Sequence, residues 1–401
     1  MITIRWKETR RRFLEAFSAA VVSVAAGLQL RAGTPKTRQK KERKPGVVLT
    51  PPSSSGCYPS YDKQWQWPVQ LEGEFETQIP QYSTRSYFCD QVEKVQPTHH
   101  FKPGTTNFHD WKQDLRPKLR TLLGLDDQVV SPLNSRILST EEFPDFKIEK
   151  IVFQSEPNVW VPTLLYIPHN LKGPARTLLH CHGHGSGLDQ SLYSYIADFA
   201  RRGYVVVSPE VRDFGERAFG KRGEMTCDRV YKLAAMLGKN LTGLRLWDFI
   251  RAIDYLETRQ EVDPKRIACG GLSLGGELSM FLAAMEERIQ CAFISGFVTT
   301  YEALEFRVNN CICYIIPGIL NLCDMSDIVG LIAPRPVVVQ SGIKDPWMPI
   351  YYTRQAFAEA QEIYQAAGAS EKVVHDAFDG VHQFHGEVTF EMFDRWLPAN
   401  G

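Results

Sequence analysis

Residues 269–277, which read CGGLSLGGE, decide the fold class. The apolar run 267–271 predicts a buried strand, and the run 274–285 that follows predicts a helix. Ser273 is therefore expected on a sharp strand-to-helix turn, with a glycine two residues away on each side. The glycines keep Cβ atoms clear of nearby backbone, and the helix N-terminus favours negative charge beside the serine. In this context the serine is predicted to be a nucleophile, whereas in a chance match it would only cap a helix.

The chain beyond residue 104 alternates short apolar runs with helical patterns. Its expected strands are 147–154 and 160–167, forming a hairpin, and then 177–180, 204–207, 267–271, 291–294, 336–340 and 373–378. Its expected helices are 107–123, 192–202, 244–258, 274–285, 352–367 and 388–397. Apolar strands joined by helices predict an α/β fold with a mostly parallel central sheet flanked by helices.

A serine nucleophile needs a general base and a group that orients the base. Asp345 and His382 each follow a predicted strand, in the order that such sites use. Chemistry in open α/β sheets collects beyond the carboxyl ends of the strands, so Asp345 is predicted as the acid and His382 as the base. His385 is the alternative base. Asp324 and Asp327 also precede the histidines but are expected to cap a helix.

An ester-cleaving serine also needs N–H donors for the oxyanion. The amide of Leu274, directly after the serine, is one candidate. The second is the amide of His184, in the loop 180–187, which reads HCHGHGSG. His180, His182 and His184 alternate as metal ligands on a strand would, but the interleaved glycines favour a loop whose backbone approaches a substrate. The sequence therefore predicts no metal and no cofactor.

The chain contains nine cysteines, which are scattered along the sequence. Cys269 and Cys291 lie in strand-like runs, where a thiol behaves as a small hydrophobe. Cys311, Cys313 and Cys323 form a loose cluster, but no histidine is near them in the sequence, so a metal site would lack ligands. Free thiols are the favoured interpretation, and a disulfide between two of these three stays open if the protein is exported.

Charged residues in two segments have a structural interpretation. The run 209–217, PEVRDFGER, follows a strand end, where its charges could contact a substrate or brace neighbouring loops. Arg245, Asp248, Arg251 and Asp254 recur every third residue along a predicted helix, which indicates structural ion pairs.

The N-terminal part resembles an export signal rather than a domain. Residues 9–14, TRRRFL, match a twin-arginine signal, and the apolar run 17–30 is too short and alanine-rich for a membrane span. Residues 1–45 carry twelve Lys/Arg and three Asp/Glu, while the rest carries 34 basic and 43 acidic residues. Such a mildly acidic body predicts no nucleic-acid binding. We expect a signal over 1–30, a flexible linker over 31–56 and an extension over 57–104 that packs on the main domain. The product would be periplasmic or secreted, with no stable membrane insertion, and cytoplasmic if 1–30 is not a signal.

Together the motifs resemble the α/β-hydrolase superfamily. The narrower resemblance is to dienelactone-hydrolase-like and acetyl-xylan-esterase-like bacterial proteins. It rests on the segments 180–185, 211–217, 271–277, 310–318, 324–327, 333–336, 345–346 and 384–386. The resemblance implies an α/β-hydrolase domain over 105–401 that acts as a serine esterase on a small-molecule ester, with Ser273, Asp345 and His382 as triad. The chain has Gly380-Val381 where such proteins usually have two glycines before the histidine.

Two other functions are weighed against the esterase. A serine peptidase of the prolyl-oligopeptidase type shares the triad order, but it generally carries a propeller domain, and this chain has no internal repeats. A non-catalytic binding protein could use the same fold, but the intact serine, aspartate and histidine argue against that. The sequence indicates neither the natural ester nor the oligomeric state.

Overall fold

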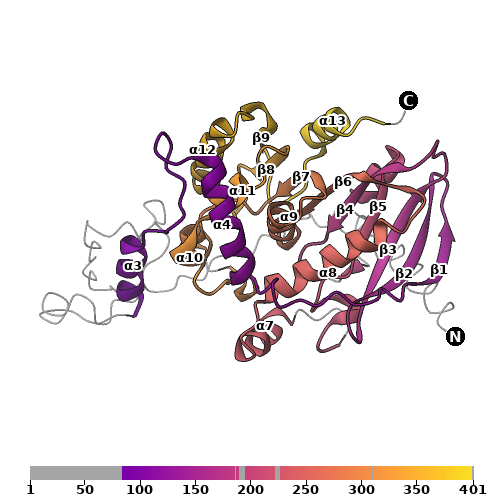
Figure 1. The fold of residues 1–401 in the computed structure, drawn as a ribbon, viewed down its shortest axis with the longest axis horizontal. Helices are drawn as coiled ribbons and strands as arrows, with labels where there is room; N and C mark the ends of the chain where they lie inside the picture. The colour runs from indigo at the N-terminus through magenta and orange to yellow at the C-terminus, as the bar shows by residue number, and fades with distance from the viewer. Residues whose placement is uncertain (1–83, 186, 189–194, 222–225, 309, 400–401) are drawn as a thin grey trace, which may run out of the picture. The chain divides into compact units, whose positions relative to one another are not determined.

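The computed structural model describes residues 84–399 except 186, 189–194, 222–225 and 309. Within them lies one sheet of nine strands in the order β1-β2-β3-β5-β4-β6-β7-β8-β9 (Figure 1). The strands are β1 (Arg136–Glu142), β2 (Phe146–Glu156), β3 (Val159–Pro168), β4 (Ala175–Cys181), β5 (Val205–Pro209), β6 (Val262–Leu272), β7 (Ile289–Ser295), β8 (Val337–Gly342) and β9 (Val373–Phe378). The β1-β2, β2-β3 and β3-β5 pairs are antiparallel and the others are parallel. The predicted α/β class with a mostly parallel sheet is confirmed.

The described residues contain ten helices, and those that pack on the sheet cover both of its faces. The ten helices are α3 (Thr84–Lys94), α4 (Phe108–Leu122), α6 (Ile196–Arg201), α7 (Cys227–Met236), α8 (Leu241–Leu256), α9 (Leu274–Met285), α10 (Ile319–Leu322), α11 (Met325–Gly330), α12 (Ile350–Ala366) and α13 (Gly386–Trp396), with short turns η1 (Gly215–Arg217), η2 (Ala303–Arg307), η3 (Ile312–Tyr314) and η4 (Ser370–Lys372). No helix among the described residues has the length and hydropathy to cross a bilayer.

Successive side chains of the central strands pack alternately into two separate apolar cores, one on each face of the sheet. In β8, Val337 and Val339 join the core beneath α4, α8, α9, α11 and α12, while Val338 joins the core beneath α6 and α13. Both faces of the central strands are therefore dry, which explains their continuous apolar sequence. The buried sheet provides the rigid frame from which the strand-end loops project.

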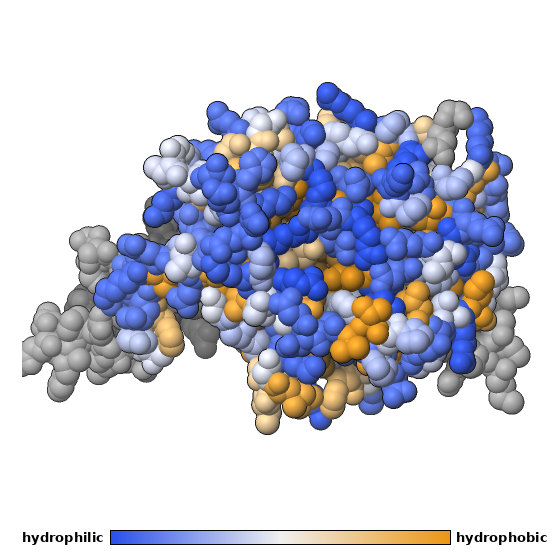
Figure 2. Space-filling view, viewed as in Figure 1, coloured by the Kyte–Doolittle hydropathy of each residue, from blue (hydrophilic) through white to orange (hydrophobic). Residues whose placement is uncertain are grey.

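Most predicted elements occur within a few residues of their expected bounds, but several observed elements were not predicted, among them α3, α10, β1 and α7. The β2-β3 hairpin turns where expected, with Asn158 at φ 64°. β1 was not predicted because nearly all of its side chains are exposed and carry no alternating pattern. α7 was not predicted because apolar side chains lie on both of its sides: Val230 and Tyr231 pack against the core, whereas Leu233 and Met236 are exposed. Figure 2 shows apolar colour at the surface in the region of this helix.

Part of the predicted extension over 57–104 can be described. Thr98 and His99 donate backbone hydrogen bonds to the carbonyls of Asn321 and Leu322, and the amide of Phe101 donates to Asp327 Oδ1. This segment therefore packs on α10 and α11. The predicted signal over 1–30, the linker over 31–56 and residues 57–83 lie outside the described residues.

Candidate active site

Ser273 stands between β6 and α9 in a strained backbone conformation. Its φ is 63° and its ψ is −121°, a region that costs a residue with a side chain about 1–3 kcal/mol. The amide of Ser273 donates to the carbonyl of Ser295 at 2.9 Å. A Cβ added to Gly271 or Gly275 would lie 2.1 or 1.9 Å from the carbonyl oxygen of Cys181. Both glycines are thus required for the end of β4 to pass beside the turn.

Asp345 and His382 form a close pair. Asp345 follows β8, His382 follows β9, and His382 Nδ1 lies 2.7 Å from Asp345 Oδ2. Asp345 is buried, and its Oδ1 accepts hydrogen bonds from the amides of Trp347 and Met348 at 2.8 and 3.2 Å. The carboxylate is therefore fixed from both sides, and the imidazole can turn little about its own bond.

The loop after β7 connects this pair with the serine turn. Ser295, the last residue of β7, accepts the hydrogen bond from the Ser273 amide, and Gly296 follows it. A Cβ added to Gly296 would lie 3.0 Å from His382 Cε1. The His382 ring therefore rests on the residue next to the backbone partner of Ser273. The three predicted triad residues thus follow strand ends at the carboxyl edge of the sheet, where His382 and Asp345 are in direct contact.

His385, the alternative base, contacts a different carboxylate. Its Nδ1 lies 2.8 Å from Asp376 Oδ2, and its ring stacks on Phe378 with the centroids 4.6 Å apart. Its backbone carbonyl accepts a hydrogen bond from Gln340. His385 is thus held by β8 and β9, away from the pair formed by His382 and Asp345.

The two predicted oxyanion donors lie on segments next to the serine turn. Leu274 is the first residue of α9, so its N–H has no acceptor within the helix. On the other side, a Cβ added to Gly183 would lie 3.6 Å from Ser273 Cβ. His184 is the next residue, so its amide belongs to the loop that touches the serine turn.

The first two histidines of the 180–187 loop have structural partners. His180 Nδ1 lies 2.9 Å from Ser208 Oγ, and burial lowers the pKa of His180 to about 3. His182 Nδ1 lies 2.9 Å from the Gly183 carbonyl, and its Nε2 accepts the Val211 amide. Burial also lowers the pKa of His182 to about 4. Both rings are neutral and occupied, so the three histidines do not converge as a set of metal ligands.

Tyr314 is a neighbour of the nucleophile that the sequence interpretation missed. Its Oη lies 3.4 Å from Ser273 Oγ and 3.2 Å from His184 Nδ1. The tyrosine is buried at the end of η3, directly after the Cys311-x-Cys313 run. The sequence analysis used that run for its cysteines and for the family resemblance, and gave no role to the tyrosine that follows it.

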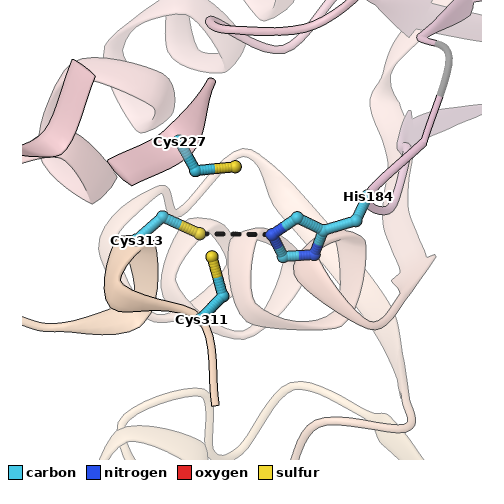
Figure 3. A group of neighbouring side chains, drawn as sticks. All are labelled: His184, Cys227, Cys311 and Cys313. Atoms are coloured by element: carbon cyan, nitrogen blue, oxygen red, sulfur yellow. Dashed lines mark hydrogen bonds between the residues drawn. The ribbon is translucent and has the colours of Figure 1, made fainter. Parts of the chain in front are cut away.

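The cysteine cluster differs from the expected one. Cys311 and Cys313 lie with His184 and Cys227, and the ligand atoms of these four residues are within 4.8 Å of one another (Figure 3). Cys323, the third expected member, instead ends α10. All eight cysteines among the described residues are free thiols.

The charged run 209–217 braces the loops. Arg212 contacts Asp248 at 2.7 Å and also pairs with Glu156, and Arg217 contacts Asp248 at 2.8 Å. Burial alone would raise the pKa of Asp248, but the two arginine charges outweigh it and lower that pKa to about 2. Arg212 and Arg217 thus tie this loop to α8 and to the end of β2.

The predicted ion pairs of α8 occur with partly different partners. Arg251 pairs with Asp254 in the same helix, as the spacing predicted, but Arg245 pairs with Asp213 at 2.7 Å in the loop after β5.

The capping role predicted for Asp324 is confirmed, because it caps α11 in a capping box.

The serine turn, the carboxylate–histidine pair and the sheet order define the class of α/β hydrolases. The model of the Abhydrolase family matches residues 79–369, and the chain belongs to this family. A Bacillus subtilis (strain 168) protein named "Putative hydrolase YtaP" is 26% identical over 307 residues, which cover 71% of this chain and 100% of that protein.

Solved structures share the fold. A "putative acetyl xylan esterase" from Bacteroides fragilis NCTC 9343 has a TM-score of 0.64 and 19% identity, and the match covers 83% of this chain and 92% of that one. A glucuronoyl esterase from Solibacter usitatus has a TM-score of 0.53 and 16% identity, covering 76% and 97%. At these identities the likeness concerns the architecture.

Proposed function

We propose that this protein is a serine carboxylic-ester hydrolase with Ser273 as nucleophile, His382 as base and Asp345 as the group that orients the base. The observation that carries the proposal is the 2.7 Å contact between His382 Nδ1 and buried Asp345, on a ring that rests beside the strained serine turn. A structural serine would have no need of a strained backbone beside a carboxylate–imidazole pair.

The proposed reaction follows from these contacts. With Nδ1–H donating to Asp345, His382 Nε2 is free to accept the Ser273 proton while Oγ bonds to the ester carbonyl carbon. The amides of Leu274 and His184 stabilise the oxyanion. The imidazolium returns the proton to the departing alcohol as the C–O bond breaks. Water then attacks the acyl-enzyme with His382 again as base, which releases the acid and restores Ser273.

For the substrate we propose a small ester, such as an acetylated sugar or a plant-derived ester. The acetyl xylan esterase and glucuronoyl esterase descriptions of proteins with this fold support that class. The proposed chemistry is common to esterases and serine peptidases, so the choice of an ester over a peptide rests on these descriptions.

Hydrolysis of p-nitrophenyl esters of increasing acyl length tests the proposal. Ser273→Ala should lower turnover by about 10⁴-fold or more, because the nucleophile is lost while the fold remains. Ser139→Ala, at an exposed position of β1, is the matched control and should keep wild-type turnover. Near wild-type turnover by Ser273→Ala, or cleavage of peptide anilides in preference to every ester, would contradict the proposal.

We also propose export through a twin-arginine signal in residues 1–30. Its support is the order of the arginine pair, the Phe-Leu step and the apolar run in the sequence.

A further inference from the structure

Four side chains of metal-binding type converge beside the serine turn from separate segments. His184 follows β4, Cys227 begins α7, and Cys311 and Cys313 lie at η3. Figure 3 shows the three sulfurs and the imidazole edge directed toward one common point. Their ligand atoms lie within 4.8 Å of one another, and His184 Nε2 is 3.3 Å from Cys313 Sγ.

We propose that His184, Cys227, Cys311 and Cys313 bind one Zn²⁺ ion as a closed structural site. Three thiolates and one imidazole form a common ligand set of structural zinc. Tetrahedral bonds of about 2.3 Å to sulfur and about 2.0 Å to nitrogen separate the ligand atoms by roughly 3.5–3.8 Å. Because the four atoms already lie within 4.8 Å, shifts below about 1 Å would complete the tetrahedron. Binding exchanges three thiol protons for the ion.

The surroundings of the imidazole fit a metal ligand. A zinc-bound histidine usually donates its second ring N–H to a neighbouring acceptor, which fixes the ring. His184 Nε2 faces the sulfurs, and its Nδ1 lies 3.2 Å from Tyr314 Oη. The tyrosine oxygen can thus accept the remaining N–H of a zinc-bound His184.

A buried cation lies against the same cluster. Arg245 is fully buried beside Cys313, and its Nε and Nη1 have no hydrogen-bond partner among the described residues. Zn²⁺ with three thiolates carries one net negative charge, which needs compensation in a buried place. Arg245 places a positive charge from α8 beside this group while its Nη2 also pairs with Asp213, so it lowers the cost of the buried negative charge without cancelling it.

A disulfide explains the cluster less well than a metal does. A bond between two sulfurs would leave the third thiol and the His184 ring without a role, and the structure has all three cysteines as thiols. Zinc instead uses all four groups at once. This inference departs from the sequence-based prediction of no metal, which treated the histidine loop and the cysteines as separate features.

The position of the ion determines its role. With four protein ligands it has no open position for water, so it takes no part in the proposed ester chemistry. It ties the His184 loop and α7 to η3, whose Tyr314 touches Ser273. The ion therefore holds in place the loop that carries the second oxyanion amide.

Metal analysis of the untagged full-length chain, purified under reducing conditions, tests the site. We expect about one zinc per chain, falling below about 0.2 in Cys311→Ser combined with Cys313→Ser. Cys291→Ala, at a buried thiol of β7, is the matched control and should keep its zinc. Ser273→Ala should also keep its zinc while losing turnover, so failure of this proposal and failure of the esterase proposal are distinguishable.

Cobalt supplies a second readout that does not depend on the folding of a variant. Wild-type protein produced with Co²⁺ should show the thiolate-to-cobalt charge-transfer absorption and the visible bands of a tetrahedral site. Wild-type protein with less than about 0.2 zinc per chain after incubation with zinc would overturn the proposal. A disulfide between any two of the three cysteines in protein grown with zinc, or full zinc in a folded double variant, would overturn it equally.

Discussion

The two histidines that follow β9 contact different carboxylates, although they are three residues apart. His382 contacts Asp345 and His385 contacts Asp376. Only His382 also lies against Gly296, the neighbour of the serine turn. The choice between them therefore depends on contacts made by β7 and β8, which the sequence of the loop alone does not contain.

We expect His382→Gln to lower ester turnover by about 10³-fold or more, because glutamine cannot accept the serine proton. The matched His385→Gln should keep turnover within several-fold of wild type and lower the urea midpoint, because buried Asp376 loses its imidazole partner and keeps only Gln340 among the described residues. Steady-state rates on one p-nitrophenyl ester and urea titrations provide both readouts. A larger rate loss in His385→Gln would assign the base to His385.

We expect the buried His180 to lower the free energy of unfolding at acidic pH. Burial lowers the folded-state pKa of His180 to about 3 from the ordinary histidine value of 6.5, so the unfolded chain binds this proton first as pH falls. The contribution of neutral His180 to the free energy of unfolding is therefore fully present above pH 6.5. It is lost progressively as pH falls toward 3. At pH 5 the loss amounts to about 2 kcal/mol.

The difference between variants isolates this contribution, because other titrating groups are common to both. His180→Asn keeps a side-chain partner for Ser208 but cannot be protonated, so its free energy of unfolding should fall less between pH 7.5 and 5 than that of wild type. His109→Asn, at an exposed site in α4, should follow wild type. Parallel pH profiles of His180→Asn and wild type, measured by urea unfolding, would refute the assignment.

At the scale of elements, the close approach of β4, β6 and α9 shapes the serine turn. Gly271 and Gly275 both allow the Cys181 carbonyl at the end of β4 to pass where a Cβ would stand. The sequence motif is thus a packing requirement between three elements as well as a local turn. The same contact aligns the loop after β4 with the serine.

Gly275→Ala should therefore be severe. Its Cβ would lie 1.9 Å from a backbone oxygen, so we expect a loss of at least about 2 kcal/mol in the free energy of unfolding. Because the turn must move, ester turnover should fall by at least about 10²-fold. Gly238→Ala, where φ is 66° but no atom lies within 4 Å, should cost about 1 kcal/mol and keep turnover. Equal losses in the two variants would contradict this account.

At the scale of the whole molecule, the sheet collects residues from distant parts of the chain at one edge. β6, β8 and β9 are parallel, so the residues after them emerge together. Residues 1–30, outside the described part of the chain, are the predicted export signal. Their proposed role as a signal is testable independently of the enzyme.

Arg10→Lys combined with Arg11→Lys should retain the precursor inside a bacterial cell, because the arginine pair is the recognised part of such a signal. Cell fractionation with immunoblotting measures the distribution. Arg38→Lys combined with Arg43→Lys, in the predicted linker, preserves the same charge and should leave export unchanged. Identical fractionation of all versions would exclude a twin-arginine signal in residues 1–30.

The sequence by itself determined what local patterns encode. The apolar runs gave the strands and their alternation with helices, and the glycines around Ser273 indicated the turn. Asp345 and His382 were found because each follows a strand, and parallel strand ends meet at one edge. β1 was missed because nearly all of its side chains are exposed, and α7 was missed because apolar side chains lie on both its buried and its exposed side, so neither element has a clear periodic pattern.

Only the tertiary structure decided which distant groups meet. His184 and Cys313 are 129 residues apart, and Ser273 and Tyr314 are 41 apart, and no local period joins such pairs. The partner of Arg245 was likewise in a loop rather than one turn along α8. These contacts depend on how β4, α7 and η3 pack together. The sequence therefore specified the proposed triad, while packing brought together the four candidate zinc ligands.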